Sequence, residues 1–329
     1  MHEKLAAAID IVRTASRLTK SIQKQRTTFV FEKKDHSPVT LADYASQLLI
    51  ASLLQEQFPE IPLMAEENLQ ELQSGDPALL DLINSLLVQV KPDFSMQQVI
   101  DRDALIRRGY PAEECWVLDP IDGTKGFLRG EQFAIALALL KQGEPVLGVV
   151  GCPNLDRRAN ADTEGGGVVA YAVRAAGAWI IPGDGSLSPV RLLVSDCADP
   201  AQARFVTSAE SSHSNQDLIL VLKSTLKNPL EIETFDSQAK YVMVAAGRSD
   251  LFLRLPPSRQ PDYHEKVWDH AAGSLIVIEA GGMVTDIFGK PFDFTTGSAL
   301  DNNYGLVVSN GRIHAQVTDY FGSVLPTKN

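Results

Sequence analysis

Apolar residues recur at helical spacing in the first part of the chain. Residues 3–25 carry one apolar stripe, formed by Leu5, Ile9, Val12, Ala15, Leu18 and Ile22. Intervals of three and four residues predict an amphipathic helix. A second helix is predicted over residues 40–57, because a similar apolar face ends just before Pro59.

The middle of the chain holds short apolar runs that are separated by turn residues. The runs occupy residues 115–118, 133–140, 146–150, 168–173 and 178–181. The first predicts a strand that leads into a loop, and the other four predict two hairpins. We therefore expect an antiparallel sheet over residues 110–182, covered by the two N-terminal helices. Residues 69–109 predict a helix-containing excursion before that sheet.

The pattern changes after about residue 194. Strand-like runs at 204–208 and 251–255 alternate with helical patterns at 216–226, 237–246 and 268–280. Such alternation favours an α/β arrangement. We expect two halves, an α+β half over residues 1–190 and an α/β half over residues 191–329.

Composition narrows the class of protein. The chain has 329 residues, 44% of them hydrophobic, and a net charge of -11, which argues against disorder and against a duplex nucleic-acid binder. Its three cysteines fit neither a disulfide framework nor a zinc site, so buried free thiols are expected. The N-terminus has no signal-peptide pattern, and no apolar run is long enough to span a bilayer, which predicts a cytoplasmic protein.

A carboxylate pair follows the strand predicted at 115–118. The sequence D-P-I-D-G-T at 119–124 places Asp119 and Asp122 three residues apart. Pro120 restrains the backbone and Gly123 permits a sharp turn, so both carboxylates and the Ile121 carbonyl can face one space. Oxygen ligands of this kind suit magnesium. The alternative is an ordinary turn, in which Asp, Pro and Gly are common.

Three other acidic positions are ambiguous when each is considered alone. Asp43 fits a capping box with Thr40, and this role is compatible with a place at an anion site. Glu66-Glu67 follows an apolar run, but such pairs are usually solvated. Asp269 lies at a predicted helix start, where it would act as an N-cap or as a ligand, and the adjacent His270 is expected to be a packed side chain.

In combination, these motifs identify a resemblance. With E-E at 66–67, D-P-I-D-G-T at 119–124 and W-D-H-A-A-G at 268–273, the chain resembles the inositol monophosphatase superfamily of magnesium-dependent, lithium-sensitive phosphatases. Within it, S-P-V-T-L-A-D-Y-A-S-Q at 37–47, K-G-F-L-R-G at 125–130 and D-S-Q-A-K-Y at 236–241 are similar to the 3′(2′),5′-bisphosphate nucleotidases of the yeast and plant salt-tolerance type. The resemblance implies a layered αβαβα sandwich of the sugar phosphatase type.

The resemblance also implies a catalytic centre with two to three Mg²⁺ ions. Its implied metal ligands are Glu66, Asp119, the carbonyl of Ile121, Asp122 and Asp269, with Asp119 as the bridge. Asp43 and Thr124 are the implied pair that takes a proton from the attacking water. Ala65 departs from the family, which more usually has Gly before the glutamate pair, and this could shift the strand end.

The implied substrate is a small nucleotide that carries two phosphates. Its implied contacts are Gly123, Thr124, Ser212, His213, Ser237, Lys240 and Arg254. Lys240 and Arg254 would hold the 5′-phosphate, the Arg with a bidentate fork. Ser237 lies three residues before Lys240, so the two are expected to share one face of a helix.

The expected activity is removal of the 3′-phosphate from adenosine 3′,5′-bisphosphate, with its sulfated relative and inositol bisphosphates as further substrates. Two alternatives stay open, an inositol or sugar phosphate phosphatase and a nucleotide sensor without turnover. We expect no nucleic-acid or membrane partner. A monomer is slightly favoured, although the oligomeric state stays open.

Overall fold

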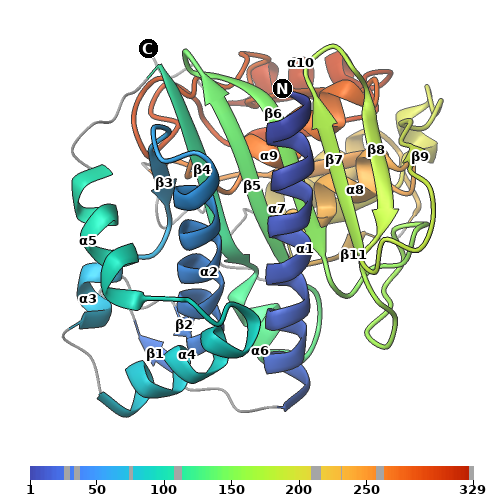
Figure 1. Cartoon of the computed structure of the whole chain (residues 1–329). Helices are drawn as coiled ribbons and strands as arrows, with labels where there is room; N and C mark the ends of the chain where they lie inside the picture. Colours follow the sequence, from blue (N-terminus) through green and yellow to red (C-terminus); the bar gives the residue numbers. More distant parts are fainter. Residues whose placement is uncertain are drawn as a thin grey trace.

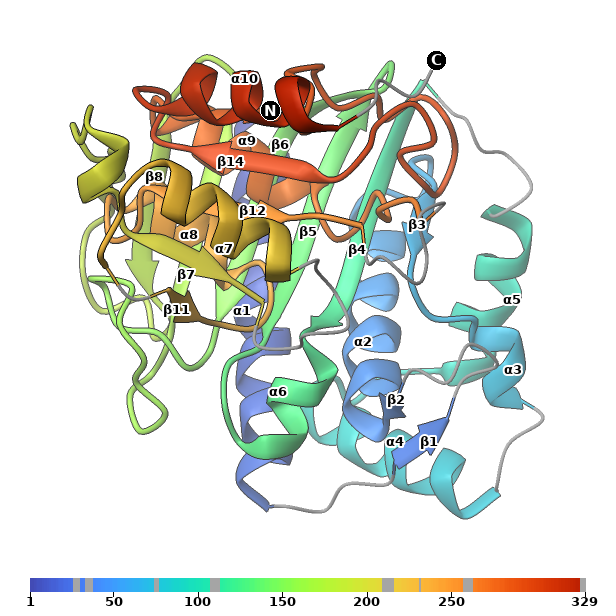
Figure 2. The same cartoon turned by 180° about the vertical axis from the view of Figure 1, so that it is seen from behind.

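The computed structural model describes residues 1–25, 30–32, 38–73, 77–106, 113–208, 216–230, 232–256 and 263–325. Five layers follow one another, helix, sheet, helix, sheet and helix (Figures 1 and 2). The expected αβαβα sandwich is thereby confirmed. No helix in the described ranges is long and apolar enough to cross a membrane.

The larger sheet has seven strands in the order β3-β4-β5-β6-β7-β8-β9. They are β3 (Leu63–Ala65), β4 (Glu114–Asp122), β5 (Ala134–Lys141), β6 (Glu144–Cys152), β7 (Val168–Val173), β8 (Ala178–Pro182) and β9 (Val190–Arg191). Only the pairing of β3 with β4 is parallel in this sheet. The predicted antiparallel sheet is therefore confirmed and gains one short strand at each edge.

Helices α1 (His2–Gln25) and α2 (Leu41–Gln57) cover one face of the larger sheet, as Figure 1 shows. Both were predicted from their apolar stripes. The strands β1 (Val30–Glu32) and β2 (Pro38–Thr40) form a small ribbon before α2. Where the structure describes it, the excursion at 69–109 contains three helices, α3 (Leu69–Gln73), α4 (Pro77–Val90) and α5 (Met96–Ile106).

The smaller sheet has five strands in the order β11-β10-β12-β14-β13. They are β10 (Phe205–Thr207), β11 (Glu233–Thr234), β12 (Leu251–Arg254), β13 (Met283–Thr285) and β14 (Leu306–Ser309). Helices α8 (Ala239–Ala245) and α9 (Ala271–Glu279) lie between the sheets, whereas α7 (Gln216–Thr225) and α10 (His314–Val324) cover the far side (Figure 2). The short α6 (Thr124–Arg129) follows β4, and a 3₁₀ turn spans Pro200–Gln202.

The alternation of side chains along the strands builds separate cores between these layers. In β5, Ile135, Leu137 and Leu139 face α1 and α2, while Ala136 and Ala138 face the middle helices. The middle-facing side chains are small, so α9 packs closely on the sheet. A Cβ at Gly148 of β6 would lie 2.7 Å from the Ala272 carbonyl oxygen of α9.

The change from one sheet to the other falls between β9 and β10. Helices α8 and α9, from the second part of the chain, pack against both sheets. The division into halves at residues 190 and 191 therefore stays a prediction about domain organisation.

The expectation for the cysteines is only partly met. Cys115 and Cys152 are buried free thiols, and burial raises the pKa of the Cys115 thiol to about 12. Cys197 is also free but half-exposed, so the expectation of burial is wrong for it. It lies in the segment between the two sheets, where less protein covers each side chain.

Candidate functional site

The D-P-I-D-G-T stretch forms the last residues of β4 and the start of α6. In the pairing with β5, Asp119 lies opposite Ala136 and Asp122 opposite Ala134, so β4 has one extra residue between them. A regular strand would turn side chains three positions apart to opposite faces. The bulge removes that conflict and lets the two carboxylates approach one space.

Gly123 joins this strand to α6 in a conformation that suits glycine. Its φ is 87°, in the left-handed region. A Cβ here would also lie 3.0 Å from the Cβ of Ser237, which comes from the second half of the chain. The loop therefore depends on glycine for its turn and for its close approach to Ser237.

Asp43 and Thr124 meet, as the resemblance implies. The Thr124 hydroxyl lies 3.3 Å from Asp43 Oδ1 and 3.3 Å from the Ile121 carbonyl oxygen, either of which can accept its proton. Asp43 is fully buried, and its Oδ2 accepts hydrogen bonds from the backbone N–H and hydroxyl of Thr40 at 2.7 and 2.6 Å. Asp43 thus completes the capping box of α2 and reaches Thr124 at the same time.

The two glutamates lie where β3 ends beside β4. The N–H of Glu66 donates to the Leu118 carbonyl at 3.2 Å, which places Glu66 next to Asp119. Glu66 is half-buried and Glu67 is 2% exposed, so the alternative of a solvated pair is wrong. The Gln47 side chain holds the backbone of Glu67 through hydrogen bonds of 2.7 and 2.9 Å. Ala65 is a strand residue without positive φ, so its methyl group requires no strain.

Asp122 connects the two parts of the site. Its Oδ2 accepts a 2.6 Å hydrogen bond from the N–H of Gln238, just before α8. Burial raises the pKa of Asp122 to about 6, while Lys240 and Arg254 act in the opposite direction and Glu66 raises the pKa further. Lys240, Arg254 and Glu66 are therefore close enough to act on this carboxylate.

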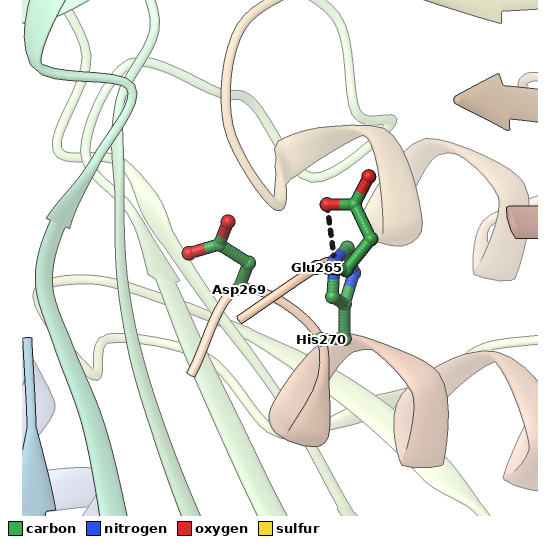
Figure 3. Close-up of side chains that lie close together, drawn as sticks. All are labelled: Glu265, Asp269 and His270. Carbon is green, nitrogen blue, oxygen red and sulfur yellow. Dashed lines mark hydrogen bonds and ion pairs between the residues drawn. The ribbon is translucent and has the colours of Figure 1, made fainter. Parts of the chain in front are cut away.

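Asp269 lies just before α9, and Figure 3 shows its carboxylate near Glu265 and His270. Burial, followed by repulsion from Asp122, raises the pKa of Asp269 to about 7. Arg254 lies 3.6 Å from its Oδ2 and 3.3 Å from Glu265. The N-cap of α9 is His270, which makes no side-chain cap bond, so the alternative of an N-cap role for Asp269 is wrong.

His270 is the packed side chain that the sequence predicts. It is 1% exposed and lies between Tyr241, at 2.7 Å from Nδ1, and Glu265, at 3.0 Å from Nε2. Figure 3 shows this bond to Glu265 and the carboxylate of Asp269 beside it. In the described ranges, these three residues are the one group of at least three potential ligands whose atoms all lie within 4.8 Å. Because Glu265 already binds His270 and Arg254, we interpret the group as structural support for Asp269.

The implied ligands Glu66, Asp119, Asp122 and Asp269 do not gather as tightly as that group. They nevertheless share one region, because Glu66 raises the pKa of both Asp122 and Asp269. Buried carboxylates that repel one another are stabilised by a divalent cation, and oxygen donors are the ones that magnesium prefers. The residues present therefore fit a metal centre.

Of the implied nucleotide contacts, the structure describes some and leaves others outside its described residues. Lys240 is 5% exposed, and its ammonium donates to the Phe235 carbonyl at 3.0 Å and lies 5.1 Å from the centre of the Phe252 ring. Burial lowers the pKa of Lys240 to about 8, although Asp122 acts to raise it. Ser212 and His213 lie outside the described residues.

The expected helical face of Ser237 and Lys240 is wrong. α8 begins at Ala239, and Ser237 precedes it with a φ of 68°. The Ser237 hydroxyl accepts the N–H of Ala239 at 3.2 Å. Asp122 holds the next residue, Gln238, through its N–H, and this contact sets the backbone before the helix.

Sequence reasoning assigned no role to three residues that position the site, Gln238, Arg129 and Glu265. Gln238 donates from Nε2 to the Trp268 carbonyl at 2.9 Å and accepts the N–H of Gly273 at 3.1 Å. Arg129 of α6 forms an ion pair with the buried Asp236. The D-S-Q-A-K-Y stretch could have indicated Gln238, but Glu265 sits in an ordinary charged run that carries no signal.

Known proteins show the same pattern over nearly the whole chain. The profile of the inositol monophosphatase family matches residues 1–321. A 3′(2′),5′-bisphosphate nucleotidase of Schizosaccharomyces pombe is 36% identical over 96% of this chain and 94% of its own. One from Oryza sativa is 39% identical over 94% of this chain and 91% of its own.

Solved structures have the same fold. The IMPase of Thermotoga maritima has a TM-score of 0.67 at 25% identity and covers 98% of each chain. The inositol monophosphatase from Anabaena has a TM-score of 0.64 at 19% identity and covers 99% of this chain and 97% of its own. With its motifs, its layered fold and these similarities, the chain belongs to the inositol monophosphatase family.

Proposed function

We propose that this protein is a phosphomonoesterase that removes the 3′-phosphate from adenosine 3′,5′-bisphosphate and yields AMP. The observation that carries the proposal is one space that holds carboxylates from both parts of the chain together with the buried Lys240 and the half-buried Arg254. Glu66 raises and Arg254 lowers the pKa of both Asp122 and Asp269, and Lys240 lowers the pKa of Asp122. Similarity to the nucleotidases supports the choice of a bisphosphate nucleotide.

Two to three Mg²⁺ ions are the proposed cofactors. Glu66, Asp119 and the Ile121 carbonyl would hold one, and Asp119, Asp122 and Asp269 would hold another. Bound divalent ions neutralise phosphate charge and make water more acidic. A lithium ion in place of one Mg²⁺ would supply less charge, so inhibition by lithium is part of the proposal.

Thr124 and Asp43 are the proposed acceptor of the water proton. Asp43 Oδ2 is held by Thr40, which leaves Oδ1 to orient the Thr124 hydroxyl. The Thr124 oxygen can then accept a hydrogen bond from the attacking water, so that the water proton passes toward Asp43 as the new P–O bond forms. The bond between phosphorus and the ribose 3′-oxygen breaks, and that oxygen takes a proton from solvent water to leave as a hydroxyl.

Lys240 and Arg254 are the proposed contacts of the 5′-phosphate. A second phosphate would bring negative charge to the buried Lys240 and the half-buried Arg254, whose partners are a carbonyl and protein carboxylates. Gly123, Thr124 and Ser237 are proposed to line the same space. Ser212 and His213 are proposed contacts outside the described residues, and cytoplasmic location and a monomeric state remain predictions.

The test measures phosphate release with Mg²⁺ from adenosine 3′,5′-bisphosphate, AMP and inositol 1-phosphate, with Asp122→Ala as the variant. We expect fast release from the first substrate and loss of release in the variant. Preference for inositol 1-phosphate would replace the nucleotide by the sugar phosphate alternative. Nucleotide binding without release from any of the three would favour a sensor.

A further inference from the structure

A basic groove runs along α1, at residues that the proposed catalytic site does not use. It is a cavity of about 460 Å³ between α1 and the loops at Pro153, Gly165-Gly166 and Gly183-Asp184. Figure 1 shows the last turns of α1 beside the loops that follow β6 and β8. Among the residues that the structure describes, none of the proposed metal, catalytic or nucleotide contacts lines it.

Four basic side chains of α1 line this groove, Arg13, Arg17, Lys20 and Lys24. Their spacing of four, three and four residues puts them on one helical face. Asp184 is the one acid among the described lining residues, so the groove is strongly basic in a chain with a net charge of -11. Such a concentration of one sign requires a counter-charge or open solvent.

Protein carboxylates supply part of that counter-charge, from Asp10, Asp162, Glu164 and Asp184. Arg13 pairs with Asp10 at 3.2 Å, and Lys24 lies 3.9 Å from Glu164. Within the described ranges, Arg17 and Lys20 form no ion pair; Arg17 donates to the Gly183 carbonyl at 3.3 Å and Lys20 to the Gly165 carbonyl at 2.6 Å. Burial, followed by the charge of Lys24, lowers the pKa of Lys20, while Asp162 and Glu164 act to raise it.

The glycine loops in the wall of the groove leave space for a ligand. The N–H of Gly183 is used by the Gly167 carbonyl, so that wall is fixed. At Gly166, by contrast, a Cβ would meet nothing within 4 Å. The glycine loop is therefore open toward solvent at its tip.

We propose that this groove is a second binding site, for a small organic or inorganic polyanion that carries at least two phosphate or sulfate groups. Its volume falls in the range of about 300–1,000 Å³ that is usual for small-molecule sites. At a rise of about 1.5 Å per residue, the basic residues extend over roughly 16 Å along the helix, more than a single phosphate spans. A polyanion can therefore contact several of them at once.

The test is calorimetric titration of metal-free protein in EDTA with tripolyphosphate. Gly166→Glu places a negative charge at the open tip without removing any contact, and Gly166→Lys places a positive one there. We expect the first to weaken binding about tenfold and the second to strengthen it, with Gly166→Ala unchanged. Raising the salt concentration from 50 to 300 mM should weaken binding in every case, because these groups are partly exposed.

The variant Lys240→Gln tests whether tripolyphosphate binds at the proposed substrate site instead of in this groove. Binding that is lost in Lys240→Gln and unaffected at Gly166 would overturn the proposal, as would the absence of saturable binding to the wild type or equal affinity in Gly166→Glu and Gly166→Lys. Unchanged phosphate release by the Gly166 variants checks their folding. If Gly166→Glu does not fold, Arg17→Gln replaces it, with the same tenfold loss expected.

Discussion

The two sides of the candidate site differ in charge and in origin. The first side, from residues 43–124, contributes Asp43, Asp119, Asp122 and Thr124, which lie at the end of β4 and the start of α2 and α6. The second side contributes Lys240 of α8 and Arg254 of β12. It also contributes the acids Glu265 and Asp269, which lie near Arg254. The first side is thus acidic, and the second combines cations with acids.

This difference indicates a division of labour. Burial shifts the pKa of Asp122 upward and that of Lys240 downward, and each group partly reverses the shift of the other. Buried charges of opposite sign stabilise one another only when the fold holds them together. We infer that the acidic side, together with Asp269 of the second side, serves the metal ions and water of the reaction, whereas Lys240 and Arg254 serve the substrate.

Replacement of Asp119 should have the largest effect, because the proposed metal centre would lose the carboxylate that both ions would share. Asp119→Asn should lower kcat about 10³-fold or more, since metal charge stabilisation is worth several kcal/mol and each tenfold corresponds to about 1.4 kcal/mol. Phosphate release with adenosine 3′,5′-bisphosphate measures the effect. Asp81→Asn on α4, an exposed acid, is the control, and an equal loss there would contradict the assignment.

Removal of the Thr124 hydroxyl should have the next largest effect. Thr124→Val keeps the shape of the side chain but cannot orient water, so kcat should fall about 10²-fold or more. Thr124→Ser keeps the hydroxyl and should retain most of the activity. Urea unfolding should give nearly the same free energy for all three proteins. A serine variant as inactive as the valine variant would assign Thr124 a packing role.

On the second side, Lys240→Met should weaken the recognition of a substrate's 5′-phosphate. A hydrogen bond to a charged group is worth about 1.5–3 kcal/mol, so kcat/KM for adenosine 3′,5′-bisphosphate should fall about tenfold or more. Adenosine 3′-phosphate lacks the 5′-phosphate and should be affected much less. Equal losses for both substrates would mean that Lys240 acts through Asp122. Lys223→Met on α7 is the matched control.

A fall in pH should lower the stability of the fold through His314, a residue away from the site. His314 is 3% exposed and lies 2.8 Å from the hydroxyls of both Thr285 and Ser309. Because Thr285 donates its proton to the Asp286 carbonyl, its oxygen accepts from Nε2–H, and the ring is satisfied while neutral. Burial accordingly lowers the pKa of His314 to about 4.

The sign of this effect follows from proton binding. Between pH 6.5 and pH 4 the unfolded chain binds the proton and the folded chain does not, so stability is complete above pH 6.5 and is lost as the pH falls. The free energy of unfolding should drop by about 1 kcal/mol between pH 7 and pH 5.5 from this residue alone. Urea unfolding of wild type and His314→Gln at both values measures it. An equal drop in both proteins would remove His314 as the cause.

The sequence by itself determined much of the first side. The apolar stripes located α1 and α2, and the D-P-I-D-G-T motif placed Asp119, Asp122 and Gly123 at a strand end, because strand, turn and glycine conformation are local properties. The capping box also predicted the backbone around Asp43.

Only the tertiary structure decided the second side. Ser237 lies outside the helix that the sequence predicts, because Asp122, far away in the sequence, binds the N–H of Gln238. No sequence pattern assigned a role to Glu265, but it is 4% exposed and holds both Arg254 and His270. Such roles depend on burial and on partners from distant segments, which no local pattern contains.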